Sequence, residues 1–108
     1  MQIKKNEVGI TYGEFQDSSG HTCSIQESSK ASEPCIWLGV NDAAPTIMCR
    51  DAALIGMTPE TDVGTMPYPI PEEVNLHTRM ELSQEQVRDL LPALQHFAET
   101  GELPTGSI

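Results

Sequence analysis

Residues 81–101 read Glu81-Leu82-Ser83-Gln84-Glu85-Gln86-Val87-Arg88-Asp89-Leu90-Leu91-Pro92-Ala93-Leu94-Gln95-His96-Phe97-Ala98-Glu99-Thr100-Gly101. Apolar residues recur in this stretch at helical spacing and form one stripe: Val87, Leu90, Leu91, Leu94 and Phe97. Ser83 is suited to cap the first turn, and Gln86 occupies the capping-box position three residues later. Gly101 follows the last periodic residue, as a left-handed helix stop does. The pattern predicts a helix from about Gln84 to about Thr100.

Pro92 lies inside this predicted helix. A proline there removes one backbone hydrogen bond and presses on the carbonyl of Arg88, which usually costs about 3 kcal/mol. Either the helix is kinked at Pro92, or two short helices meet there. The apolar stripe continues in phase across Pro92, which favours one kinked helix.

Alternating apolar and polar residues predict β-strands in the rest of the chain. The predicted strands cover residues 8–12, 21–26, 35–40 and 74–82. Asp17-Ser18-Ser19-Gly20 is a turn sequence that would join the first two strands into a hairpin, and Gly13 marks a bulge or bend in the first. Residues 1–6 are expected to be a loose polar start. The fold class is therefore α+β, an antiparallel sheet of about four strands with the C-terminal helix on one face.

Residues 41–73 form a long insert in this single predicted domain. Five of the eight prolines fall in it: Pro45, Pro59, Pro67, Pro69 and Pro71. A loop of this length in a compact domain is usually functional or mobile. Thr46–Arg50 could add one short strand, and Met66–Pro71 is expected to be extended, because proline fixes its own φ and restricts the preceding residue.

The charge of the chain limits its partners. It has 108 residues, with 16 acidic and 6 basic side chains and a formal charge of −10. Binding to the phosphates of DNA or RNA requires clustered Lys and Arg, so direct nucleic-acid binding is not expected. The acidic charge fits either solubility or mimicry of nucleic acid. Without an apolar run suited to a secretion signal or a membrane helix, we expect the host-cell cytoplasm and no membrane.

The chain offers few groups for catalysis or metal binding. Cys23, Cys35 and Cys49 lack any C-x-x-C pair, so a disulfide framework is not expected. No cysteine or histidine pair has structural-zinc spacing, and no metal or cofactor is expected. Cys49, next to Arg50, is the best candidate nucleophile and leaves a small hydrolase as an alternative function.

A binding surface is better supported by the sequence. In the predicted sheet, the helix would cover an apolar face that includes Val74, Leu76, Met80, Ile25, Ile36 and Leu38. The opposite face would carry the candidate ligand-binding or partner-binding residues: Ser24, Gln26, Trp37, His77 and Arg79, with Ser28 and Ser29 at the rim. Trp and Arg dominate binding hot spots, so an exposed Trp37 in a sheet requires a cover. That cover would be the 41–73 insert acting as a lid, a second copy in a homodimer, or a ligand.

Four strings in the chain are characteristic in combination. They are Cys23-Ser24-Ile25-Gln26-Glu27-Ser28-Ser29, Ile36-Trp37-Leu38-Gly39, Arg79-Met80-Glu81-Leu82, and Leu90-Leu91-Pro92-Ala93-Leu94-Gln95 with Phe97 and Thr100-Gly101. With these strings the chain resembles a group of small uncharacterised proteins of bacteriophages and prophages. The resemblance covers about two thirds of the chain and excludes the 41–73 insert.

This resemblance implies a phage or prophage context. Small soluble phage proteins are often accessory factors that counter host defences by inhibiting a host protein or sequestering a signalling nucleotide. We therefore expect a non-enzymatic accessory binding protein. A nucleotide would stack on Trp37 and pair its phosphate with Arg79, whereas a host protein would present a basic surface. A structural or self-assembling phage component is a further alternative.

Overall fold

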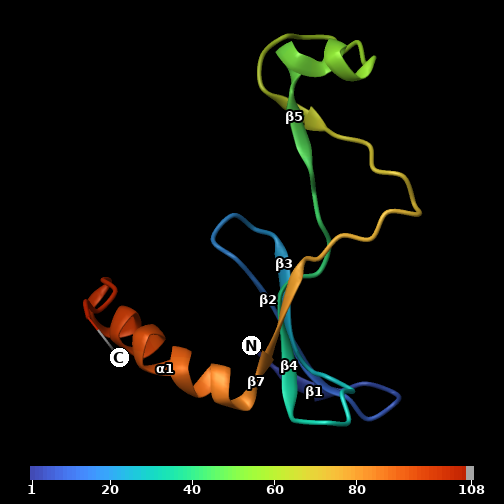
Figure 1. Cartoon of the computed structure of the whole chain (residues 1–108). Coiled ribbons are helices and arrows are strands. Elements are labelled where there is room, and N and C mark those ends of the chain that lie inside the picture. The colour runs from blue at the N-terminus through green and yellow to red at the C-terminus, as the bar shows by residue number, and fades with distance from the viewer. Residues whose placement is uncertain (107–108) are drawn as a thin grey trace. The chain divides into compact units, whose positions relative to one another are not determined.

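The computed structural model describes residues 1–106 and divides the chain into two compact units. The first unit contains residues 1–41 together with the chain from 79 onward, and the second contains residues 42–78. The first unit is α+β, as the sequence predicts (Figure 1).

The first unit is built on a five-stranded antiparallel sheet with the strand order β1-β2-β3-β4-β7. Its strands are β1 (Ile3–Lys5), β2 (Thr11–Gln16), β3 (Thr22–Glu27), β4 (Cys35–Val40) and β7 (Arg79–Ser83). The predicted strands at 21–26 and 35–40 and the turn between β2 and β3 are confirmed. In that turn, Gly20 has φ of 88° and donates its N–H to Asp17 O at 3.0 Å.

Four predictions for the sheet are wrong in detail. Residues 3–5 form the edge strand β1 rather than a loose start. The first hairpin strand is Thr11–Gln16, and its pairing with β3 continues through Gly13 without a bulge. Gly13 instead provides space, because a Cβ there would lie 2.7 Å from Ile3 Cδ1. The strand predicted at 74–82 begins only at Arg79, where its pairing with β4 begins opposite Gly39.

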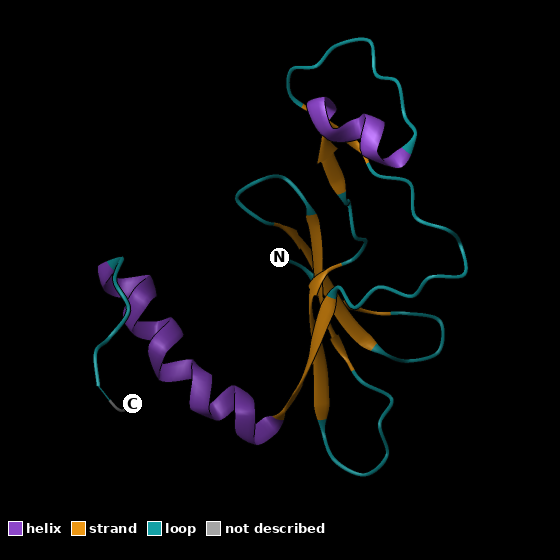
Figure 2. Ribbon diagram, turned by 45° about the horizontal axis from the view of Figure 1, so that its top comes forward, coloured by secondary structure: helices purple, strands orange, loops and turns teal. Residues whose placement is uncertain are grey.

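Helix α1 (Gln84–Thr100) follows β7 without a loop and runs unbroken through Pro92 (Figure 2). The predicted caps are confirmed. Ser83 Oγ accepts the N–H of Gln86 at 3.2 Å, and the Gln86 side chain accepts the N–H of Ser83 at 3.0 Å. Gly101 ends the helix with φ of 77°. The helix packs against the sheet at β7.

The second unit contains a two-stranded sheet of β5 (Thr46–Met48) and β6 (Thr65–Pro67), with the 3-10 helix η1 (Cys49–Ile55) between them. The short strand predicted within 46–50 is therefore confirmed for its first three residues. Cys49 and Ala52 are buried, and the N–H of Cys49 donates to Gly64 O at 2.9 Å. This small core orders part of a segment that the sequence presents as irregular.

Candidate functional site: the polar face of the sheet

The strand register separates the sheet into two faces. Residues directly opposite each other in an antiparallel pair have their side chains on the same face. The apolar face carries Ile3, Phe15, Cys23, Ile25, Ile36, Leu38, Val40, Met80 and Leu82. The polar face carries Tyr12, Glu14, Ser24, Gln26, Trp37, Arg79 and Glu81.

Arg79 is the centre of the polar face. Its Nη1 donates hydrogen bonds to Ser24 Oγ at 3.3 Å and to Gln26 Oε1 at 3.2 Å. Its guanidinium carbon lies 5.7 Å from the centroid of the Trp37 ring, within the distance of a cation–π contact. One side chain on β7 therefore contacts residues on β3 and β4 and is held in a defined orientation.

The structure brings together four of the seven predicted site residues in this arrangement: Ser24, Gln26, Trp37 and Arg79. Trp37 is half-buried rather than fully solvent-facing, because Arg79 lies over its ring. Ser24 is 5% exposed, so its hydroxyl depends on Arg79 as a partner more than an exposed serine would.

Ser28 lies near the end of the same face. Its hydroxyl donates to Glu81 Oε2 at 2.9 Å and accepts the N–H of Lys30 at 3.1 Å. Lys30 Nζ also lies 3.9 Å from Glu81 Oε1. These contacts give Ser28 a structural role in the loop between β3 and β4, whereas Ser29 is exposed in that loop.

The prediction that His77 belongs to this sheet face is wrong. His77 precedes β7 and lies in the second unit, outside every strand. The regular alternation of residues 74–82 predicted that His77 lies in a strand. A strand, however, requires an adjacent strand to pair with as well as alternating residues. Val74 instead closes a turn through its N–H to Pro71 O at 3.0 Å.

A hollow of about 320 Å³ adjoins Arg79 on the polar face. Its lining residues are Asn6, Tyr12, Glu14, Ser24, Gln26, Asn41 and Arg79. Most ligand pockets have volumes of roughly 300–1,000 Å³, so this hollow is suited to a small molecule. Its amide, hydroxyl and phenol groups, with one carboxylate and one guanidinium, provide both donors and acceptors.

Sequence reasoning missed Tyr12, Glu14, Asn6 and Asn41. The strand predicted over residues 8–12 counts Tyr12 among its apolar positions, whereas the register places Tyr12 opposite Gln26 on the polar face. Phe15 is the residue that could have corrected this assignment. It lies three positions after Tyr12, so in a regular strand its side chain is on the opposite face from Tyr12 and on the same apolar face as Ile25. Asn41 Nδ2 donates to Glu14 Oε2 at 3.2 Å, so these two residues form one wall of the hollow.

The cysteines are buried and unpaired by disulfides. Burial, together with the nearby carboxylate of Glu33, raises the pKa of the Cys35 thiol above its ordinary value. Cys49 is buried at the start of η1, which limits access to the thiol considered as a nucleophile. Within residues 1–106, no group of three or more His, Cys, Asp or Glu side chains is placed to hold a metal ion.

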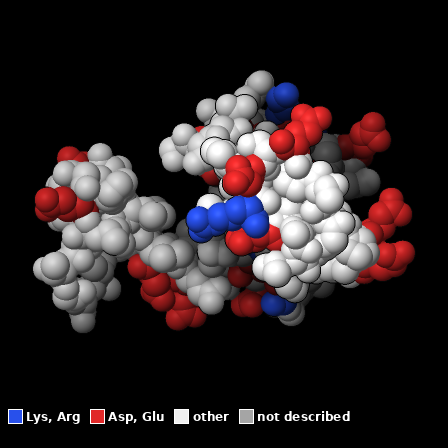
Figure 3. Space-filling view, turned by 90° about the horizontal axis from the view of Figure 1, so that it is seen from above, with Lys and Arg blue, Asp and Glu red and all other residues white. Residues whose placement is uncertain are grey.

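Carboxylates dominate the charged surface. Figure 3 shows Asp and Glu side chains scattered over the viewed face with few Lys or Arg among them. No α-helix in the described part of the chain is long and apolar enough to cross a bilayer.

Comparison of the chain with protein-family models, curated proteins and solved structures gives no match. The residues of the polar face are therefore the basis for a functional assignment.

Proposed function

We propose that this chain is a non-enzymatic accessory protein of the phage or prophage type that sequesters a small nucleotide on the polar face of its sheet. The observation that carries this proposal is the arrangement of Arg79, fixed by Ser24, Gln26 and Trp37 at the edge of a hollow. A guanidinium held in this way loses little further freedom when it pairs with a phosphate.

The remainder of the hollow suits a nucleoside. Tyr12 offers aromatic surface to a base, and Gln26 and Asn41 bring amide groups of the kind that match the donor and acceptor edges of bases. Glu14 is an acceptor for a ribose hydroxyl or a base amino group. The carboxylate disfavours a phosphate beside it, so the phosphate belongs at Arg79.

The test is isothermal titration calorimetry with a panel of mononucleotides and cyclic nucleotides. We expect one or more of them to bind the wild-type chain and Arg79→Ala to abolish binding. Arg88→Ala removes an exposed arginine on α1, outside the hollow, and is the matched control that retains binding. Arg79→Lys keeps the charge but loses the planar fork and should weaken binding at least tenfold.

The acidic surface favours inhibition of a basic host protein as a second candidate function. A net charge of −10 would accelerate encounter with a basic partner, and salt would weaken that complex. Capture from a host lysate in low salt, followed by elution in high salt, tests this candidate. A chain that binds nucleotides after all proteins have been removed supports the first candidate instead.

A further inference from the structure

The apolar face of the sheet is incompletely covered in one chain. Ile3 and Met80, on the two outermost strands of that face, are 54% and 55% exposed, and Phe15 is also exposed. Among the described residues of the first unit, the buried side chains of hydrophobic type are only Cys23 and Cys35. A sheet with one apolar face requires a second layer over it.

Helix α1 supplies an apolar stripe but buries little of it. Val87, in the first turn, is half-buried near Leu82 and Ile36, which line the same hollow of about 450 Å³. Beyond that turn, Leu94 is 57% exposed and Phe97 is 53% exposed, and no residue of α1 is buried. Figure 1 shows α1 diverging from the sheet after it leaves β7.

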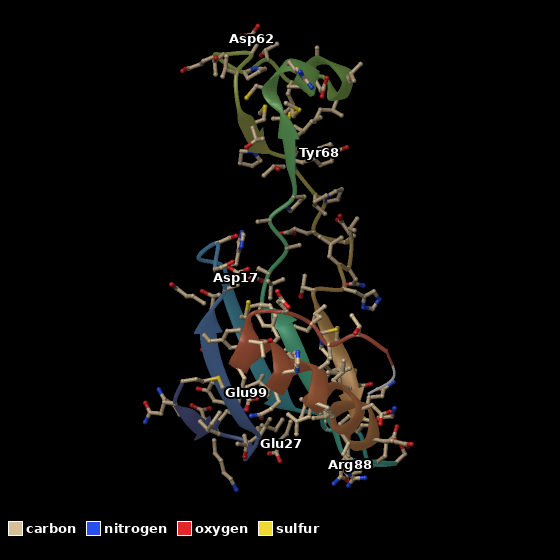
Figure 4. The ribbon with its side chains drawn as sticks, turned by 90° about the vertical axis from the view of Figure 1, so that its left-hand side faces the viewer. Asp17, Glu27, Asp62, Tyr68, Arg88 and Glu99 are labelled. Atoms are coloured by element: carbon tan, nitrogen blue, oxygen red, sulfur yellow. The ribbon has the colours of Figure 1, made fainter. Side chains whose placement is uncertain are left out.

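The junction between β7 and α1 explains this divergence. The helix starts directly after the strand, and the capping box at Ser83 fixes its first turn. The N–H of Gln84 also donates to Pro34 O at 3.2 Å. Without a linker to reorient it, α1 leaves the sheet after its first turn (Figure 1), and in Figure 4 it is drawn in front of the strands. Its stripe residues stay exposed, so α1 does not cover the apolar face.

We propose that the apolar face and the α1 stripe form an isologous homodimer interface, in which α1 of each copy lies across the apolar face of the other. The dimensions match. A helix of 17 residues is about 25 Å long, and a sheet of five strands is about 19 Å wide. Each copy has one helix with an exposed stripe and one uncovered apolar face. In a two-fold symmetric dimer, each helix therefore covers the apolar face of the other copy.

The exposed area is sufficient for such an interface. The chain exposes 8666 Å², whereas two separate compact bodies of these sizes would expose only about 7,100 Å². The excess of about 1,600 Å² is summed over both units, and it is about twice the roughly 800 Å² per partner that a stable interface buries. This interface is opposite to the Trp37 face considered for self-association from the sequence, so it leaves the polar face accessible and does not depend on the proposed function.

The first experiment is analytical ultracentrifugation over a concentration series at physiological ionic strength, because two chains of charge −10 repel each other in low salt. We expect a dimer. Leu94→Glu should weaken it about 100-fold or more, since a carboxylate would replace an interface anchor. Leu54→Glu is the matched control, because Leu54 is 84% exposed in the second unit and its replacement should leave the dimer intact.

A cross-linking experiment identifies the geometry. A chain carrying Met80→Cys is mixed with a differently tagged chain carrying Leu94→Cys and treated with a short bismaleimide. We expect a product that contains both tags, because Met80 of one copy faces α1 of the other. The wild-type chain, with its three buried cysteines, measures background linking.

Three results would overturn the proposal. They are a monomer at every concentration, a dimer that Leu94→Glu leaves unchanged, and a mixture without the two-tag product. The first would mean that α1 closes over its own sheet or that another protein covers it. A link only within single chains carrying both cysteine substitutions would identify closure. None of these results depends on whether a nucleotide binds.

Discussion

Arg79 lies over the ring of Trp37, with the guanidinium carbon 5.7 Å from the ring centroid. Arg79 also hydrogen-bonds Ser24 and Gln26, so it connects three strands of the sheet. Arg79→Met should keep the aliphatic stem but leave the buried Ser24 hydroxyl without this donor, which costs about 1–3 kcal/mol. Urea unfolding measures that cost, and Trp37, the only tryptophan, reports the loss of the Arg79 contact through its emission.

Arg88→Met is the control for this substitution, because Arg88 is exposed on α1. It should change neither the unfolding midpoint nor the emission spectrum. Equal effects of the two substitutions would show that Arg79 contributes no more to the sheet than a surface arginine does.

The capping box at Ser83 sets the start of α1. Ser83→Ala removes the acceptor for the N–H of Gln86 and should destabilise the first unit by about 1 kcal/mol. Circular dichroism during urea unfolding measures the change. Ser18→Ala, in the exposed turn between β2 and β3, is the control. If the two serine variants unfold at the same urea concentration, the cap does not limit stability.

The principal helix could be derived from the sequence because its signals are local. The stripe, the Ser83 cap and the Gly101 stop all act within a few residues, and all were located correctly. The alternation in β3 and β4 was equally informative, because both strands have a neighbour on each side that fixes their faces. The sequence therefore predicted the two central strands of the sheet and the faces of their residues.

The errors arose where a long-range partner decides the structure. Residues 74–77 alternate as a strand does, yet the pairing of β7 with β4 begins only at Arg79, opposite Gly39, and does not extend to them. His77 therefore lies outside the sheet face on which the alternation placed it. Conversely, Ile3–Lys5 contains one apolar residue and carries little strand signal, but the free edge of β2 pairs with it.

The sequence predicted the residues around Arg79 in the candidate site but not the residues of β2 that line the adjoining hollow. Ser24, Gln26, Trp37 and Arg79 lie on strands whose parity the sequence shows directly. Glu14 and Tyr12 lie on β2, where the shift of the strand to Thr11–Gln16 changed the assignment of faces.

Asp17 makes the turn between β2 and β3 sensitive to acid. Its Oδ1 accepts the N–H groups of Ser19 and His21, each at 2.9 Å. The hydrogen bond from the His21 backbone, more than the other contacts, lowers the pKa of Asp17 below its ordinary value of 3.8. Because the folded pKa is lowered, this stabilisation is complete above 3.8 and is lost as the pH falls through the folded value.

Asp17→Ala tests this dependence. The wild-type chain should be more stable than the variant at pH 6, and the difference should shrink as the pH falls below 3.8, where the carboxylate becomes protonated. Urea unfolding at several pH values measures both chains. A stability difference that stays constant down to pH 2 would exclude the Asp17 carboxylate as the cause.

The cysteine thiols should be protected in the folded chain. Cys23, Cys35 and Cys49 are 4%, 8% and 7% exposed, and burial raises the pKa of Cys35 so that less of its reactive thiolate forms. We expect slow reaction with a disulfide reagent at pH 8, and reaction of all three thiols within seconds to minutes in urea. Ser18→Cys adds an exposed thiol that should react at once in the folded chain. Rapid native labelling of Cys49 in the wild-type chain, identified by peptide mass, would restore it as a candidate nucleophile.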